Sequence, residues 1–184
     1  MCNIVEHTIS GMDLIMDDMT LEDLARDVGS ALAQQGLMLA SAESCTGGWL
    51  GQTITSIAGS SIWYERGFIT YAVISKREML GVSSTTLEQH GAVSEETAYE
   101  MAEGAIARSH AQVAVAVTGI AGPDGGTAEK PVGMVCFAWL VKDGLARTET
   151  RYFSGNREVI RRQSVAGALQ GAIDLLQGIP PMVA

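Results

Sequence analysis

The chain of 184 residues has little positive charge, because 12 Lys and Arg residues stand against 21 Asp and Glu residues and give a net charge of −9. That balance argues against nonspecific binding to nucleic acid or to an anionic membrane surface, so we expect neither as a partner. No uninterrupted apolar run approaches the roughly 18 residues that a membrane span requires. Residues 1–19 contain acidic groups but no Lys or Arg, which is unlike a signal peptide.

Cysteine and histidine are also scarce. The three cysteines stand at irregular spacing: Cys2, Cys45 and Cys136. This spacing forms neither a disulfide framework nor a zinc pattern, so we expect a cytoplasmic protein with no metal site. Of the three histidines, His7 lies in the acidic leader and His110 ends a predicted helix. His90 lies in a loop and is a minor site candidate, so a Ser-His-Asp triad has no obvious base.

What remains is the composition of one globular domain, with 47% hydrophobic and 18% charged residues. We expect an acidic leader over residues 1–19, the domain over 20–178 and a tail over 179–184. Helical periodicity predicts helices over 20–35, 47–57, 76–80, 94–109 and 156–176. Apolar and β-branched runs predict strands over 37–42, 68–74, 112–118, 134–141 and 146–153.

The turn Lys142-Asp143-Gly144 indicates a hairpin between the last two predicted strands. A hairpin requires antiparallel pairing, whereas strands separated by helices favour parallel pairing. The sequence therefore predicts a single-domain layered α/β fold with a mixed sheet of about five strands flanked by helices.

The run Ala42-Glu43-Ser44-Cys45-Thr46-Gly47-Gly48 follows a predicted buried strand and leads into a helix. It gathers hydroxyls, a thiol and backbone N–H groups where a helix N-terminus favours negative charge. Such a junction can bind an anion or stabilise an oxyanion during acyl transfer. A capped helix behind a glycine turn explains the same residues without any ligand, and this alternative stays open.

Lys76 begins a predicted helix five residues after Tyr71. A lysine that is partly buried there would have its pKa lowered by desolvation and could accept a proton from a nearby hydroxyl, as in Ser–Lys enzymes. Spacing alone favours the other interpretation, a surface lysine whose stem lies over the sheet edge.

Two further segments are suited to anions. The nine residues Thr118–Gly126 include four glycines, where backbone N–H groups can approach a phosphate or carboxylate, although a purely structural loop is the alternative. Arg157 and Arg161 lie one turn apart at the start of the last helix, where cations oppose the helix dipole. Either Glu158 or a bound phosphate would compensate them.

Together these segments resemble the C-terminal domain of the competence-damage protein CinA and its stand-alone relatives, the nicotinamide-nucleotide amidohydrolases. The resemblance covers about residues 20–176 in the family's order. It rests on the 42–48 run and on these segments: Glu65-Arg66-Gly67-Phe68, Tyr71 with Lys76, Leu80-Gly81-Val82, Gly91-Ala92-Val93-Ser94, Thr118-Gly119-Ile120-Ala121-Gly122-Pro123, Glu129-Lys130-Pro131-Val132-Gly133, and Phe153-Ser154-Gly155 with Arg157.

The resemblance implies hydrolysis of the carboxamide of nicotinamide mononucleotide to nicotinic acid mononucleotide and ammonia, without a cofactor. It assigns Ser44 as nucleophile and Lys76 as its base, with Tyr71 and Thr118 positioning or relaying the proton. It implies substrate contacts from the following residues: the N–H groups of Thr46, Gly47 and Gly48 for the oxyanion, the backbone of Gly119, and Arg157 and Arg161 for the nucleotide phosphate.

One departure keeps alternatives open. Many relatives have a polar Ser-Asn pair after the tyrosine, where this chain has Ala72-Val73. A non-catalytic nucleotide-binding or regulatory module, or an amidohydrolase of another anionic amide, would also fit these motifs. Cys45 is an alternative nucleophile. We also expect a homo-oligomer, because the predicted hairpin leaves an exposed sheet edge.

Overall fold

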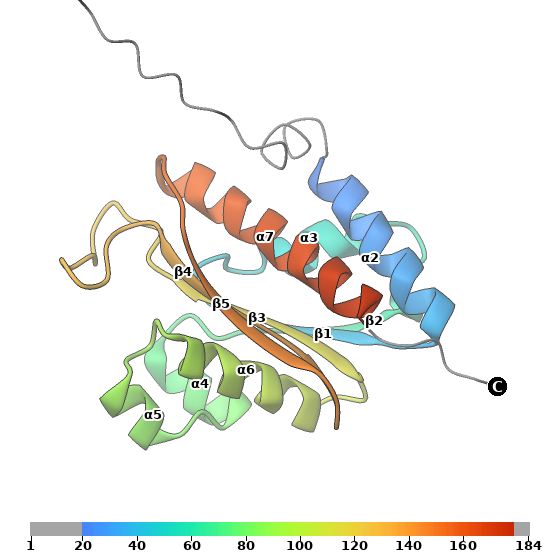
Figure 1. Cartoon of the computed structure of the whole chain (residues 1–184), viewed down its shortest axis with the longest axis horizontal. Helices are drawn as coiled ribbons and strands as arrows, with labels where there is room; N and C mark the ends of the chain where they lie inside the picture. The colour runs from blue at the N-terminus through green and yellow to red at the C-terminus, as the bar shows by residue number, and fades with distance from the viewer. Residues whose placement is uncertain (1–19, 179–184) are drawn as a thin grey trace, which may run out of the picture.

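Five strands form one mixed sheet in the order β2-β1-β3-β4-β5, with helices on both faces (Figure 1). The computed structural model describes residues 20–178. The strands are β1 (Leu39–Glu43), β2 (Tyr64–Ile69), β3 (Val113–Gly119), β4 (Met134–Val141) and β5 (Ala146–Tyr152). β1 pairs in parallel with β2 and β3, whereas β3–β4 and β4–β5 are antiparallel. The predicted fold class is confirmed, and the predicted leader and tail lie outside the described residues.

The helices are divided between the two faces of the sheet. They are α2 (Leu21–Gln35), α3 (Trp49–Thr55), α4 (Val73–Leu80), α5 (Ser84–Gln89), α6 (Glu95–Ala107) and α7 (Arg157–Gln177). Helices α2, α3 and α7 cover one face, and α4, α5 and α6 lie on the other (Figure 1). Each face has its own core: large side chains such as Leu32, Phe137 and Trp139 fill the first, and alanines with Leu80 and Met101 fill the second.

The strand predicted over 68–74 is wrong in position. β2 ends at Ile69, which pairs with Glu43 at the end of β1, so the register with its neighbour sets its length. The β-branched run that suggested a strand instead starts α4, where Val73 and Ile74 are exposed. Helix α5 was not predicted from the sequence, although Ser83 caps it by accepting the Thr86 N–H at 3.0 Å.

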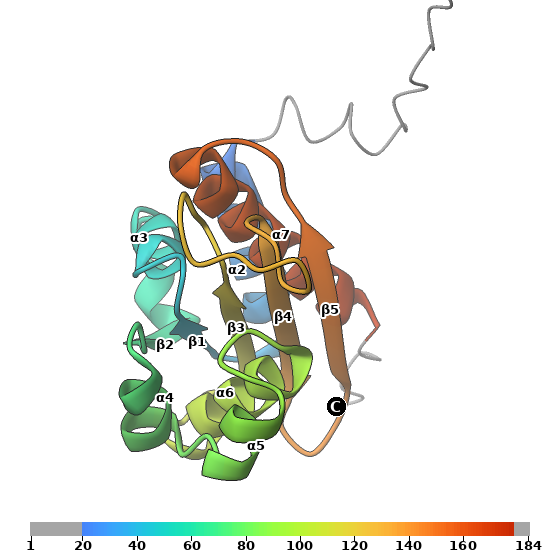
Figure 2. The ribbon, with the colours of Figure 1, turned by 90° about the vertical axis from the view of Figure 1, so that its left-hand side faces the viewer.

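The parallel strands bring the important loops to one edge of the sheet. β1, β2 and β3 all point their carboxyl ends the same way, and the chain moves from β1 to β2 on one side and to β3 on the other. A crevice at such a switch in strand order is the usual ligand site of an α/β sheet. Figure 2 looks onto this edge, where the loop between β3 and β4 crosses in front of the sheet.

Within residues 20–178, no helix combines the length and apolar character needed to cross a bilayer.

Candidate active site

Ser44 lies directly after β1, at the first position of a turn that leads into α3. The turn reverses tightly because Gly47 and Gly48 adopt left-handed backbone conformations, with φ of 61° and 94°. Residues with a Cβ rarely adopt these conformations, so the two glycines are required by the local geometry. The Ser44 N–H donates to Val117 O at 2.9 Å, which continues the ladder between β1 and β3 and fixes the start of the turn.

Lys76 lies on α4, on the face of the sheet opposite to α3 (Figure 1), and its side chain contacts Ser44. Its Nζ lies 2.8 Å from Ser44 Oγ and donates to Thr70 O at 2.7 Å. The lysine is only 1% exposed, so the surface interpretation that spacing alone favoured is wrong. Helix α4 begins at Val73 rather than at Lys76, so the lysine is the fourth residue of the helix, where its side chain is buried. The structure therefore brings the two predicted partners together.

Burial changes the acid–base properties of this pair. Desolvation lowers the pKa of the Lys76 amine from its usual 10.5 to about 8, so roughly a tenth of the amine is neutral at pH 7, far more than for an ordinary lysine. Desolvation also raises the pKa of the Cys45 thiol to about 12. A thiol with that pKa is protonated at neutral pH and is a weak nucleophile. The electrostatics favour Ser44 over Cys45.

The three predicted oxyanion donors are not equivalent in the structure. The Gly47 N–H donates to Ser44 O at 3.1 Å, and the Gly48 N–H donates to the Glu43 carboxylate at 2.9 Å. These two N–H groups are therefore already occupied. Within residues 20–178, the N–H groups of Cys45 and Thr46 donate to no other residue, and the buried Thr46 hydroxyl also has no partner. The free donors next to Ser44 are thus Thr46 and a residue not predicted, Cys45.

A cavity of about 290 Å³ opens beside the Ser44–Lys76 pair. Predicted residues Tyr71, Thr118, Gly119 and Arg157 all line it, whereas Thr46, Gly47, Gly48 and Arg161 do not. Four residues of the lining were missed from the sequence: Val73, Ala92, Val93 and Ala121. Small apolar side chains have no chemical signature in a sequence, so only the fold could place them here.

Tyr71 and Arg157 meet at the mouth of the cavity. Arg157 Nη2 donates to the Tyr71 hydroxyl at 2.9 Å, and its Nη1 donates to Gly122 O at 2.7 Å. Both side chains are exposed, and the guanidinium keeps further N–H donors for an anion. Thr118 lies deeper, where its hydroxyl donates to Ala92 O at 2.7 Å.

Arg161 has different contacts from Arg157. Its Nε donates to Cys45 O at 3.1 Å and its Nη2 donates to Thr46 O at 2.6 Å, while the guanidinium lies 5.3 Å from the centre of the Trp49 ring. These contacts direct the guanidinium to the backbone of the Ser44 turn. His90 is also outside this cavity, with its ring 3.3 Å from the Glu96 carboxylate.

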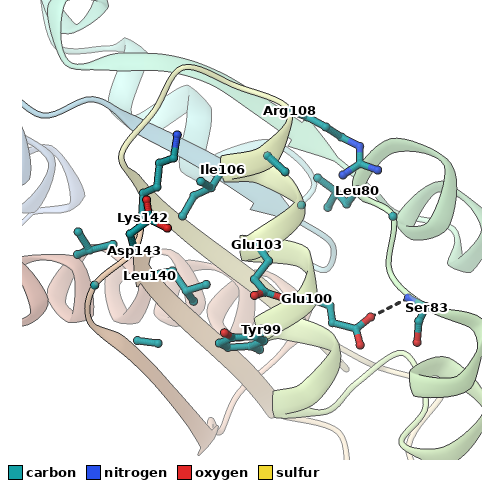
Figure 3. Close-up of a pocket in the computed structure, with 16 residues that line it drawn as sticks. Leu80, Ser83, Tyr99, Glu100, Glu103, Ile106, Arg108, Leu140, Lys142 and Asp143 are labelled. Carbon is teal, nitrogen blue, oxygen red and sulfur yellow. Dashed lines mark hydrogen bonds between the residues drawn. The ribbon is translucent and has the colours of Figure 1, made fainter.

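A larger groove, of about 750 Å³, lies elsewhere, between α6 and the β4–β5 hairpin (Figure 3). Its polar side chains are spread along an open surface, and Glu100 is engaged in capping α5 by accepting the Ser83 N–H at 2.7 Å. Among the residues that line it, no nucleophile lies against a buried base. The smaller cavity is therefore the candidate active site.

Comparisons with known proteins agree with this α/β fold. The crystal structure of competence/damage inducible protein CihA from Agrobacterium tumefaciens superposes with a TM-score of 0.82 at 49% identity, over 84% of this chain and 94% of that one. Nicotinamide-nucleotide amidohydrolase PncC of Escherichia coli strain K12 is 52% identical over 155 residues, which cover 84% of this chain and 94% of that protein. PncC of Enterobacter agglomerans is 51% identical over 158 residues, 86% of this chain and 96% of the relative.

The model of the CinA C-terminal domain family matches residues 21–176. The chain belongs to this family, and the resemblance inferred from the sequence is confirmed.

Proposed function

We propose that the protein is a nicotinamide-nucleotide amidohydrolase, which converts nicotinamide mononucleotide to nicotinic acid mononucleotide and ammonia in pyridine nucleotide salvage. The observation that carries the proposal is the buried contact between Lys76 Nζ and Ser44 Oγ at 2.8 Å. The relatives named as nicotinamide-nucleotide amidohydrolases, at about half identity over most of the chain, supply the substrate.

In the proposed reaction, Ser44 Oγ attacks the carboxamide carbon while neutral Lys76 takes the hydroxyl proton. The carbonyl oxygen becomes an oxyanion, and the free N–H groups of Cys45 and Thr46 stabilise it. When the oxyanion collapses, the C–N bond breaks and Lys76 returns its proton to the leaving nitrogen, which departs as ammonia. Water then attacks the ester on Ser44, with Lys76 again as base, and releases the carboxylic acid.

The remaining predicted residues have supporting roles in this proposal. Arg157 binds the nucleotide phosphate at the mouth of the cavity, because a guanidinium suits a phosphate and this one has N–H groups to spare. Tyr71, which Arg157 contacts, orients the arginine or the substrate. Thr118 and Gly119 line the same cavity as Ser44. The proposed reaction uses only side chains, backbone N–H groups and water.

We also propose that the protein is located in the cytoplasm, since nucleotide substrates and free thiols such as Cys136 are typical of that compartment. A homo-oligomer stays a prediction, which light scattering on the purified protein would test.

Incubation of the purified protein with nicotinamide mononucleotide, followed by an ammonia assay, tests the function. We expect release by the wild-type protein and none above background by Ser44→Ala. If the wild type releases no ammonia but the nucleotide raises its melting temperature, the chain is a binding module and the proposal is wrong. If another anionic amide is hydrolysed much faster, the chemistry stands and the substrate is wrong.

A further inference from the structure

The turn that carries Ser44 is held between two ionisable side chains of opposite sign. Glu43 precedes the turn and lies at its N–H side, and Arg161 reaches it from α7 at its carbonyl side. Neither side chain lines the cavity beside Ser44. Their hydrogen bonds go to the backbone of residues 45–51, and Arg161 also lies against the Trp49 ring, so any influence on the reaction must pass through the shape of the turn.

Glu43 is 1% exposed, and its carboxylate accepts three backbone N–H groups at the start of α3. Oε2 accepts from Gly48 at 2.9 Å and from Leu50 at 3.1 Å, and Oε1 accepts from Gly51 at 2.8 Å. No cation lies within ion-pair distance of Glu43 in the described part of the chain. A buried carboxylate is costly unless it is well paired, and here the helix N–H groups provide that pairing. Glu43 therefore fixes where α3 begins.

Arg161 fixes the direction of the peptide groups inside the turn. The Cys45 carbonyl, held by Arg161 Nε, and the Thr46 N–H belong to one planar trans peptide and point in opposite directions. Holding the carbonyl toward α7 therefore turns the Thr46 N–H away from α7. This N–H is one of the two free donors next to Ser44, and its orientation depends on the arginine.

Glu43 also connects the turn to Lys76 through the backbone. The Thr70 N–H donates to Glu43 O at 2.7 Å, and the Thr70 carbonyl accepts from Lys76 Nζ at 2.7 Å. Lys76 in turn contacts Ser44, the residue after Glu43. Hydrogen bonds through Thr70 thus link Lys76 to the backbone of Glu43, which is covalently joined to Ser44.

We propose that Glu43 and Arg161 are positioning residues, which hold the turn from its two sides so that the Ser44 hydroxyl and the Thr46 N–H face the same reacting carbonyl. For Arg161 this replaces the phosphate contact expected from the sequence. The inference rests on the proposed function for its reaction, but not for its substrate.

Glu43→Gln and Arg161→Lys test the proposal with little change in size. The glutamine amide presents a donor to one of the three helix N–H groups, and a lysine cannot hold two carbonyls in the fixed geometry of a guanidinium. We expect each variant to lower kcat by about 10- to 100-fold with KM changed by less than about threefold, as small displacements of reacting groups do. We also expect a fluorophosphonate, which phosphonylates activated serine with loss of fluoride, to label Ser44 about 10-fold or more slowly.

Two control variants distinguish a displaced Ser44 turn from a general loss of protein stability. Arg162→Lys makes the same substitution at the next residue of α7, which is exposed, and should label at the wild-type rate. Thr20→Ala removes the capping box of α2, a helix with no residue in the cavity lining, and should lower the melting temperature without slowing the labelling. Arg161→Lys keeps the test usable if Glu43→Gln does not fold.

The outcomes are distinct. If both variants label Ser44 as fast as the wild type, the inference is wrong. If Arg161→Lys raises KM and leaves kcat unchanged, Arg161 is a phosphate contact and its positioning role is wrong. If the wild type labels at Ser44 but does not release ammonia from nicotinamide mononucleotide, the proposed substrate fails while the labelling rates still decide the inference. If the wild type does not label at Ser44, both the nucleophile and its positioning are wrong.

Discussion

The cavity beside Ser44 and the groove beside α6 differ in how their polar groups are solvated. The groove is larger, about 750 Å³ against about 290 Å³, and exposed charged side chains such as Glu103 and Lys142 line it (Figure 3). The cavity has fewer polar groups, but Lys76 is buried against Ser44 and its pKa is lowered to about 8. Water screens charges in an open groove, whereas burial turns a few groups into a reactive set. Size is therefore a poor guide to chemistry in this molecule.

Among substitutions in the cavity and the groove, replacing Lys76 should lower the activity most. Lys76→Met removes the base but keeps the length of the side chain, and we expect ammonia release to fall by about 10³-fold or more. The same variant should melt about 3–6 °C higher at pH 6, because a buried amine that must be protonated there is destabilising. Activity assays and calorimetry on one preparation check both effects.

The gain in melting temperature should depend on pH. The pKa of Lys76 is about 8 in the folded protein and 10.5 at its usual value, so the burial penalty is complete below pH 8 and disappears as the pH rises to 10.5. The difference between Lys76→Met and the wild type should therefore shrink between pH 8 and pH 10.5. An equal difference at both ends would mean that the lysine is not desolvated.

Arg157 at the mouth should contribute mainly to binding. We expect Arg157→Ala to raise KM by about 10- to 100-fold through loss of the phosphate contact, with a smaller effect on kcat. Steady-state kinetics with nicotinamide mononucleotide give the two constants. Nicotinamide itself, which has no phosphate, offers the control, because its slow hydrolysis should not change in the variant.

The pH–rate profile should report the neutral amine. A base with a pKa of about 8 makes kcat rise about tenfold per pH unit below pH 8 and level off above it. Ammonia release measured from pH 6 to pH 10 gives the profile. A rate that falls over this range would indicate that a protonated group is required instead.

Substitutions in the groove beside α6 should change the activity least. Glu103→Gln changes one of its exposed carboxylates, and we expect kcat/KM to stay within about twofold of the wild type, since solvated surface charges contribute little. If this variant lost activity as Lys76→Met does, the contrast between the two regions would be wrong.

The sequence predicts the fold better than the site. Strands β1, β3 and β4 follow from apolar runs, because burial on both faces leaves a clear pattern, and β5 follows from the hairpin turn that precedes it. β2 does not, since an edge strand with Arg66 and Gly67 has a weak pattern and its register with β1 sets its end. For the site, the motifs single out Ser44 and Lys76, but the distance between them depends on the inward rotation of α4. The contacts of Arg161 with the Cys45 and Thr46 carbonyls depend on how α7 packs, which spacing along the chain does not encode.

Burial of Lys76 lowers the pKa of its amine to about 8, so that the neutral form, which can accept the Ser44 proton, is populated near neutral pH. Selective isotope labelling of lysine, with only Lys76, Lys130 and Lys142 to assign, allows each amine to be titrated by NMR. We expect a midpoint near 8 for Lys76 alone, with Lys76→Met removing that signal. A midpoint near 10.5 for Lys76 would contradict this expectation, because the amine would then be protonated and unable to accept the Ser44 proton.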